Sequence, residues 1–220
     1  MACGYRFVAA CACALLPSTA RAEPHNNDVQ VWPVVTVAKT MERLELTGDA
    51  VLQITDNASR FGLLLLRAVV DYRLTDTLSL GGGYTFVISN IDHGYEHRVV
   101  EEIVYRSSRD PHRLVVTLRS RGEQRSCECG ADLALRLRQL TRADIPTDLG
   151  VKIVVWNELF VSLDRTEWSG PSGLAAMLSF VGPGIAIARH LTVEPGYLNF
   201  TTFKPTLTRH VVAAFLSARF

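Results

Sequence analysis

The chain has 220 residues, of which 48% are hydrophobic and 20% are charged, and its formal net charge is +1. This balance provides no strongly basic surface, so nucleic acid is not an expected partner. No apolar run reaches the roughly 18 residues that a membrane-spanning helix needs, which excludes spanning by helices.

The first 22 residues have the features of a secretory signal peptide. Arg6 precedes an apolar stretch, and Ala20-Arg21-Ala22 forms a small-residue cleavage site. These are the charged, apolar and cleavage regions that export signals share. We therefore expect residues 1–22 to be removed from the mature chain.

Segments with alternating apolar and polar residues follow along the rest of the chain. Because successive strand side chains point to opposite faces, each of these segments predicts a strand. The first, at residues 29–39, contains Pro33, which lacks a ladder donor. We therefore predict that the N-terminal segment 23–41 is an edge or irregular segment. The later predicted strands lie at residues 42–55, 61–74, 78–89, 96–106, 114–125, 132–142, 151–164, 174–188, 190–203 and 209–220.

The hairpin around residues 112–142 shows this alternation most strongly, with an apolar face and a charged face on both strands. Glu101 departs from the pattern, because it falls on the apolar face of its strand, and we expect a bulge there. Outside the predicted signal peptide only Cys127 and Cys129 remain, at the tip of the hairpin. They could form a tight disulfide or stay reduced. A structural zinc site needs four ligands, and two cysteines are too few, so we expect no metal. We also expect no cofactor.

Several predicted strands exceed the ~5–6 residues typical of globular proteins and reach the ~9–11 that cross a bilayer at a tilt. A spanning sheet must close, because each unpaired edge group in lipid costs several kcal/mol. We therefore predict an all-β fold, with a closed antiparallel transmembrane β-barrel over residues 42–220. Apolar side chains should face outward and charged ones inward, with short turns at one end and longer loops at the other.

Strand number and sheet closure leave alternatives open. Bacterial single-chain barrels have an even number of strands. We therefore predict about ten, omitting the proline-bearing segment, or twelve if one strand is missed. The alternative fold is a secreted soluble β-sandwich that acts as a binding protein, with its apolar strand faces buried between two sheets.

The C-terminal residue, Phe220, is aromatic and follows an alternating apolar pattern. Such an ending resembles the last strand that bacterial barrel-assembly machinery recognises. We expect that machinery and outer-membrane lipid as partners, and the bacterial outer membrane as the location.

The pieces of sequence to compare with known families are residues 67–79 with Gly83-Tyr84, residues 96–98, residues 118–125 (LRSRGEQR), residues 135–139 (LRLRQ), residues 157–160 and residues 196–199. Together they resemble a domain-of-unknown-function family of predicted bacterial outer-membrane β-barrel proteins. The resemblance covers most of the mature chain and implies a barrel but no reaction. Asn157 is a departure, because the family usually has an acidic residue there.

The inward faces predict an interior lined by arginine and glutamate, because arginine can hold carboxylates on neighbouring strands. This interior would be a structural network or a narrow pore for small solutes, and we expect Arg136 or Arg138 to hold Glu158. The main expectation is that the protein has no catalytic activity. The alternative is an enzyme that acts on lipid or peptide, with Asp92, His93, Glu96 and His97 at one loop. The predicted lumen network consists of Arg98, Glu102, Arg119, Arg121, Glu123, Arg136, Arg138 and Glu158.

Overall fold

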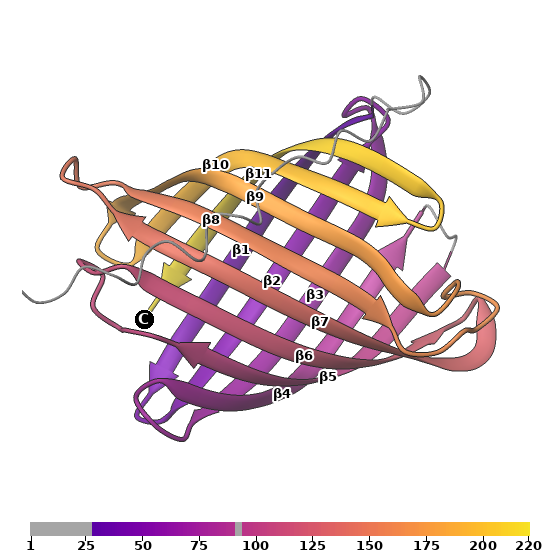
Figure 1. Cartoon of the computed structure of the whole chain (residues 1–220), viewed down its shortest axis with the longest axis horizontal. Coiled ribbons are helices and arrows are strands. Elements are labelled where there is room, and N and C mark those ends of the chain that lie inside the picture. The colour runs from indigo at the N-terminus through magenta and orange to yellow at the C-terminus, as the bar shows by residue number, and fades with distance from the viewer. Residues whose placement is uncertain (1–27, 91–93) are drawn as a thin grey trace, which may run out of the picture.

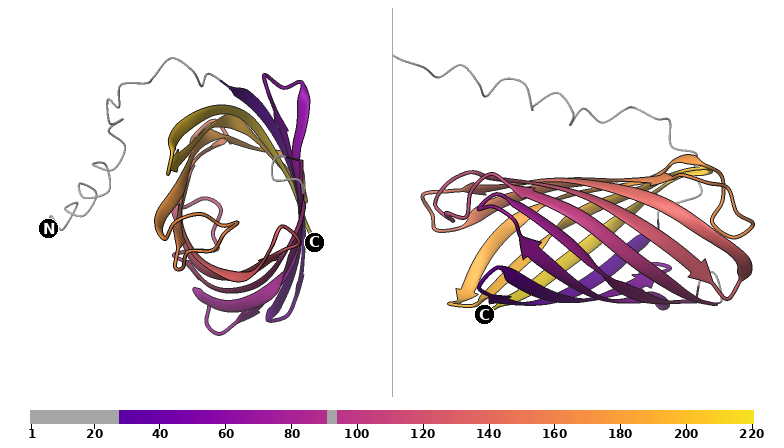
Figure 2. Two further views of the ribbon diagram at one scale, coloured as in Figure 1. Left: turned by 90° about the vertical axis from the view of Figure 1, so that its right-hand side faces the viewer. Right: turned by 90° about the horizontal axis from the view of Figure 1, so that it is seen from below.

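The computed structural model describes residues 28–90 and 94–220, so the predicted signal peptide at residues 1–22 lies outside the described part. The described chain forms one closed barrel of eleven strands (Figures 1 and 2). A single closed sheet contradicts the alternative of a β-sandwich. Among the described residues, no helix is long and apolar enough to cross a membrane.

Strands that follow one another in the sequence pair antiparallel around the whole barrel, and the first strand closes against the last. Most strands lie within a few residues of their predicted ranges, because period-two patterning marks them well. They are β1 (Val29–Met41), β2 (Leu44–Thr55), β3 (Arg60–Arg73), β4 (Leu78–Ser89), β5 (Gly94–Arg106), β6 (Val115–Cys127), β7 (Gly130–Pro146), β8 (Lys152–Ser162), β9 (Gly173–Ala188), β10 (Leu191–Phe203) and β11 (Thr206–Arg219).

The predicted counts of ten or twelve strands are wrong, because β1 is a full strand of the wall. It pairs with β2 on one side and with β11 on the other. An odd number of strands makes β1 and β11 run in the same direction, so this one pairing is parallel. The β1–β2 pairing lacks partners at Trp32 and Pro33 and then continues in the same register. One missing donor therefore does not exclude Pro33 from the wall.

Both ends of the barrel carry short turns as well as long connections. We call the end that carries Phe220 the C-terminal rim; the turns at Asp76, Pro111, Pro146 and His190 lie there. Long connections occur at both ends, with residues 107–114 at the C-terminal rim and residues 163–172 at the opposite rim. The predicted separation of short turns from long loops is therefore wrong.

Apolar side chains cover the outside of the barrel, and charged side chains point inward. On β5, Val99 and Ile103 are each 51% exposed, whereas the alternating Arg98 and Glu102 are each 7% exposed. In a soluble barrel the interior would instead hold the apolar side chains. The predicted orientation of the charged strand faces is confirmed.

Glu101 is an outward-facing carboxylate in the middle of the wall. It pairs with Gly82 on β4 and with Gly122 on β6 in continuous register, so the expected bulge is absent. Other outer polar groups bond across strands, for example Ser120 to Gln139 at 2.5 Å. Among the described residues, Glu101 has no such hydrogen bond or ion pair.

One side of the interior is apolar, which the prediction of a fully polar lumen missed. Phe180 stacks on Trp156 with ring centroids 5.4 Å apart and meets Phe215 edge-on at 5.1 Å. Gly182 and Gly196 leave room for its ring, since a Cβ on Gly196 would lie 2.6 Å from it. The buried cluster comprises Trp32, Val154, Leu178, Phe180, Leu198, Val211 and Ala213.

Candidate functional site

The centre of the charged side of the interior is a chain of ion pairs across β6, β7 and β8. Glu158 accepts hydrogen bonds from Arg138 at 3.1 and 2.6 Å and from Arg119 at 3.0 Å. Arg138 also donates to Glu123 at 2.9 Å, and Arg136 donates to the other oxygen of Glu123 at 2.7 Å. Of the two arginines expected to hold Glu158, Arg138 does so and Arg136 does not.

The remaining predicted lumen residues extend this chain towards β5. Arg121 pairs with Glu102, with its Nε 2.6 Å from the carboxylate. Arg98 pairs with Glu96 at 2.8 Å. The structure thus places all eight predicted lumen residues inside the barrel, each in an ion pair. Alternation put them on one face, and neighbouring strands brought opposite charges together.

A further pair joins strands that are not neighbours. Arg142 on β7 donates to both oxygens of Glu194 on β10, at 3.0 and 2.6 Å. The bond passes over β8 and β9, where Gly184 lies beneath Glu194 without a side chain. This pair could not be predicted from the sequence, because alternation within a strand carries no information about which distant strands face each other.

The middle of the barrel is packed. Arg121, Glu123 and Glu158 on the charged side are 1%, 3% and 4% exposed, and Phe180 and Leu198 on the apolar side are 2% and 1% exposed. The wall of a water-filled channel would be accessible to water. The two sets of side chains therefore leave no wide aqueous path through this layer.

The rim opposite the C-terminus is partly covered by the connection between β8 and β9. Viewed end-on, this connection lies within the outline of the barrel (Figure 2). Its Trp168 donates a hydrogen bond to the Asp132 carbonyl at 2.9 Å. The guanidinium of the inward-facing Arg125 lies 4.9 Å from the Trp168 ring centroid, which is a cation–π contact.

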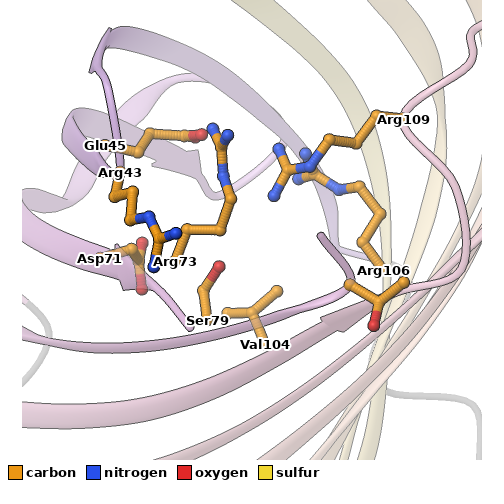
Figure 3. Close-up of a pocket in the computed structure, with 9 residues that line it drawn as sticks. Arg43, Glu45, Asp71, Arg73, Ser79, Val104, Arg106 and Arg109 are labelled. Carbon is orange, nitrogen blue, oxygen red and sulfur yellow. The ribbon is translucent and has the colours of Figure 1, made fainter. Parts of the chain in front are cut away.

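A recess opens at the C-terminal rim and is rich in arginine (Figure 3). The empty space among its lining side chains is about 420 Å³, a figure that includes open solvent. Arg43 and Arg73 lie on one side, and Arg106 and Arg109 reach towards them from the other. We call this the arginine recess. Its remaining lining residues are Glu45, Asp71, Thr77, Ser79 and Val104.

Of the residues of the alternative enzyme site, the two that the structure describes, Glu96 and His97, point to opposite sides of the wall. Glu96 faces the lumen and pairs with Arg125 at 2.5 Å, whereas His97 faces outward and bonds to the Tyr84 hydroxyl. Asp92 and His93 lie outside the described residues. In the part of the chain that is described, no group of His, Cys, Asp and Glu is arranged to hold a metal ion. Cys127 and Cys129 form a disulfide.

Comparison with known proteins places the chain in a family without an assigned activity. Residues 29–210 match the family model described as "Protein of unknown function (DUF2490)". An uncharacterised protein of Methylorubrum extorquens is 32% identical over 191 residues, which cover 83% of this chain and 82% of that protein. No solved structure matches the chain significantly. The chain therefore belongs to the DUF2490 family of proteins of unknown function.

Proposed function

We propose that this protein is a bacterial outer-membrane β-barrel that acts as a closed, structural wall element rather than as a conducting pore or an enzyme. One observation carries the proposal: a closed barrel presents its aliphatic side chains outward and its ion pairs inward. A belt of exposed apolar side chains this extensive is typical of a surface that meets lipid or another protein. Closure leaves no sheet edge unpaired, as lipid requires.

The packed interior supports a closed barrel over the alternative of a narrow pore for small solutes. Arg138 and Glu158 fill the charged side, and Phe180 and Leu198 fill the apolar side. The β8–β9 connection adds cover at one rim through Trp168. Purified protein in planar bilayers should therefore give no stable conductance steps, whereas a porin in the same lipid does. Regular steps from the folded protein would contradict closure.

Location is tested separately from conductance. Expressed with residues 1–22 in a Gram-negative host, the chain should fractionate with outer-membrane markers. The folded form should also migrate differently from the boiled form on a gel. Recovery in the soluble periplasmic fraction would refute the membrane proposal.

The exposed carboxylate of Glu101 gives a second test of lipid contact. In lipid vesicles, Glu101→Leu should raise the free energy of unfolding by about 1 kcal/mol, since a charged group facing hydrocarbon is destabilising. Glu167→Leu, in the exposed β8–β9 connection, is the control and should have little effect. Urea unfolding followed by tryptophan fluorescence measures both. A loss of stability in Glu101→Leu would mean that the outer face does not meet hydrocarbon.

Barrel-assembly machinery is the proposed protein partner, through the end of β11. Phe220 extends the parallel pairing with β1, because its N–H bonds to the Ala38 carbonyl at 2.9 Å. Its side chain is 64% exposed and so is available for recognition. Deleting Phe220 should reduce the amount of folded protein in the outer membrane, while Phe220→Tyr should preserve it. Equal levels of folded protein after the deletion would argue against this contact.

A further inference from the structure

The arginine recess differs from the rest of the interior in its charge pairing. In the centre of the barrel the predicted lumen arginines each meet a carboxylate. By contrast, Arg43, Arg73, Arg106 and Arg109 make no ion pair within 4 Å among the described residues. Two carboxylates also line the recess, and one of them, Glu45, is bonded to Arg219 at 3.1 Å. The recess therefore holds an excess of positive charge.

The four guanidinium groups form two pairs on opposite sides of the recess. Arg43 comes from the β1–β2 turn and Arg73 from the end of β3, whereas Arg106 ends β5 and Arg109 lies in the β5–β6 connection. The charges of Arg106 and Arg109 are close enough to interact. Arg109 is held by a hydrogen bond from its Nε to the Asp76 carbonyl at 3.0 Å. The positive charges repel one another, and an anion between them would offset this repulsion by attracting all of them.

The position of the recess makes it accessible from solution. Arg43 and Arg109 are exposed at the rim, and Arg73 and Arg106 are half-buried beneath them. Each guanidinium presents a planar fork that matches the oxygens of a phosphate group. The hydroxyl of Ser79 in the lining adds a further donor.

We propose that the arginine recess is a binding site for a small anion that carries phosphate groups at two ends, one group held by Arg43 and Arg73 and the other by Arg106 and Arg109. The site rests on the barrel geometry and does not depend on the membrane proposal. Arg43 and Arg109 are exposed at the C-terminal rim, so a soluble diphosphate can reach the recess from solution. A lipid with two phosphates offers the same chemistry from the membrane.

The site can be tested by isothermal titration calorimetry on the folded mature chain in detergent. The two ligands are pyrophosphate and inorganic phosphate. Pyrophosphate should bind at least tenfold more tightly, because it can engage both arginine pairs. Arg73→Gln and Arg106→Gln should each weaken pyrophosphate binding at least tenfold. Arg106→Lys, which keeps the charge but loses the fork, should have an intermediate effect. Arg113→Gln is the matched control, because Arg113 is exposed in the same connection outside the recess.

A second titration with cardiolipin separates the two sources of phosphate. Saturable binding of either ligand that depends on Arg73 and Arg106 supports the site, and the ligand that binds identifies the source. A gel shift on boiling confirms that each variant is folded. The proposal is overturned if neither ligand binds at millimolar concentration, if Arg113→Gln weakens binding as much as Arg106→Gln, or if phosphate and pyrophosphate bind equally.

Discussion

Replacing Glu158 by alanine is expected to lower the free energy of unfolding by about 3–5 kcal/mol, the usual cost of removing one partner from a buried ion pair. The Glu158 carboxylate is 4% exposed and joins Arg138 to Arg119. In the variant Arg138 would keep its bond to Glu123. Arg119 would keep no carboxylate partner within 4 Å among the described residues. The main cost therefore comes from a stranded Arg119 charge.

A second variant tests whether the unpaired charge of Arg119 causes the loss of stability. Arg119→Met in the Glu158→Ala background should recover part of the lost stability, because it removes the stranded charge. Glu158→Gln should cost less than Glu158→Ala, since an amide oxygen still accepts a hydrogen bond from Arg138. Urea unfolding in lipid vesicles measures each variant, with the exposed Glu167→Ala as control. If Glu158→Ala unfolds at the wild-type midpoint, the ion pairs do not stabilise the barrel.

The charged half of the barrel could be predicted from the sequence because its strands have one apolar face and one charged face. Over residues 119–125 of β6 every second residue is charged, and so are most inward positions of β7. The inward face of Arg121 and Arg138 could therefore be assigned without knowing their partners. On β1, β9 and β11 both faces are apolar, and alternation could not show that Trp32, Phe180 and Val211 point inward. The apolar side of the lumen was missed for that reason.

Strand count and long-range contacts required the three-dimensional structure. The parity rule for bacterial barrels outweighed the strand pattern at residues 29–41, and the structure shows that the pattern was right. The bond between Arg142 and Glu194 depends on how β7 and β10 face each other across the lumen. The arginine recess likewise combines residues from several separate connections, such as Arg43 and Arg109, and no local spacing brings these together.

The apolar side of the lumen should contribute as much to stability as the charged side. Phe180→Ala is expected to lower the free energy of unfolding by about 3–5 kcal/mol, the range for buried phenylalanine residues in packed cores. The Phe180 ring contacts Trp156 and Phe215, and Gly182 and Gly196 pack against its edge. These backbones belong to a closed wall and cannot collapse into the space, so a cavity would remain.

The neighbouring residue on the same strand provides the control. Val181 points outward and is 49% exposed. Val181→Ala should cost at most about 1 kcal/mol, because fluid lipid chains fill the gap that the two missing methyl groups leave. Unfolding midpoints in lipid vesicles compare the two variants. Equal losses of stability would mean that Phe180 and Val181 have similar surroundings. That result would contradict a packed apolar cluster inside the barrel. It would also contradict the closed interior on which the proposed function depends.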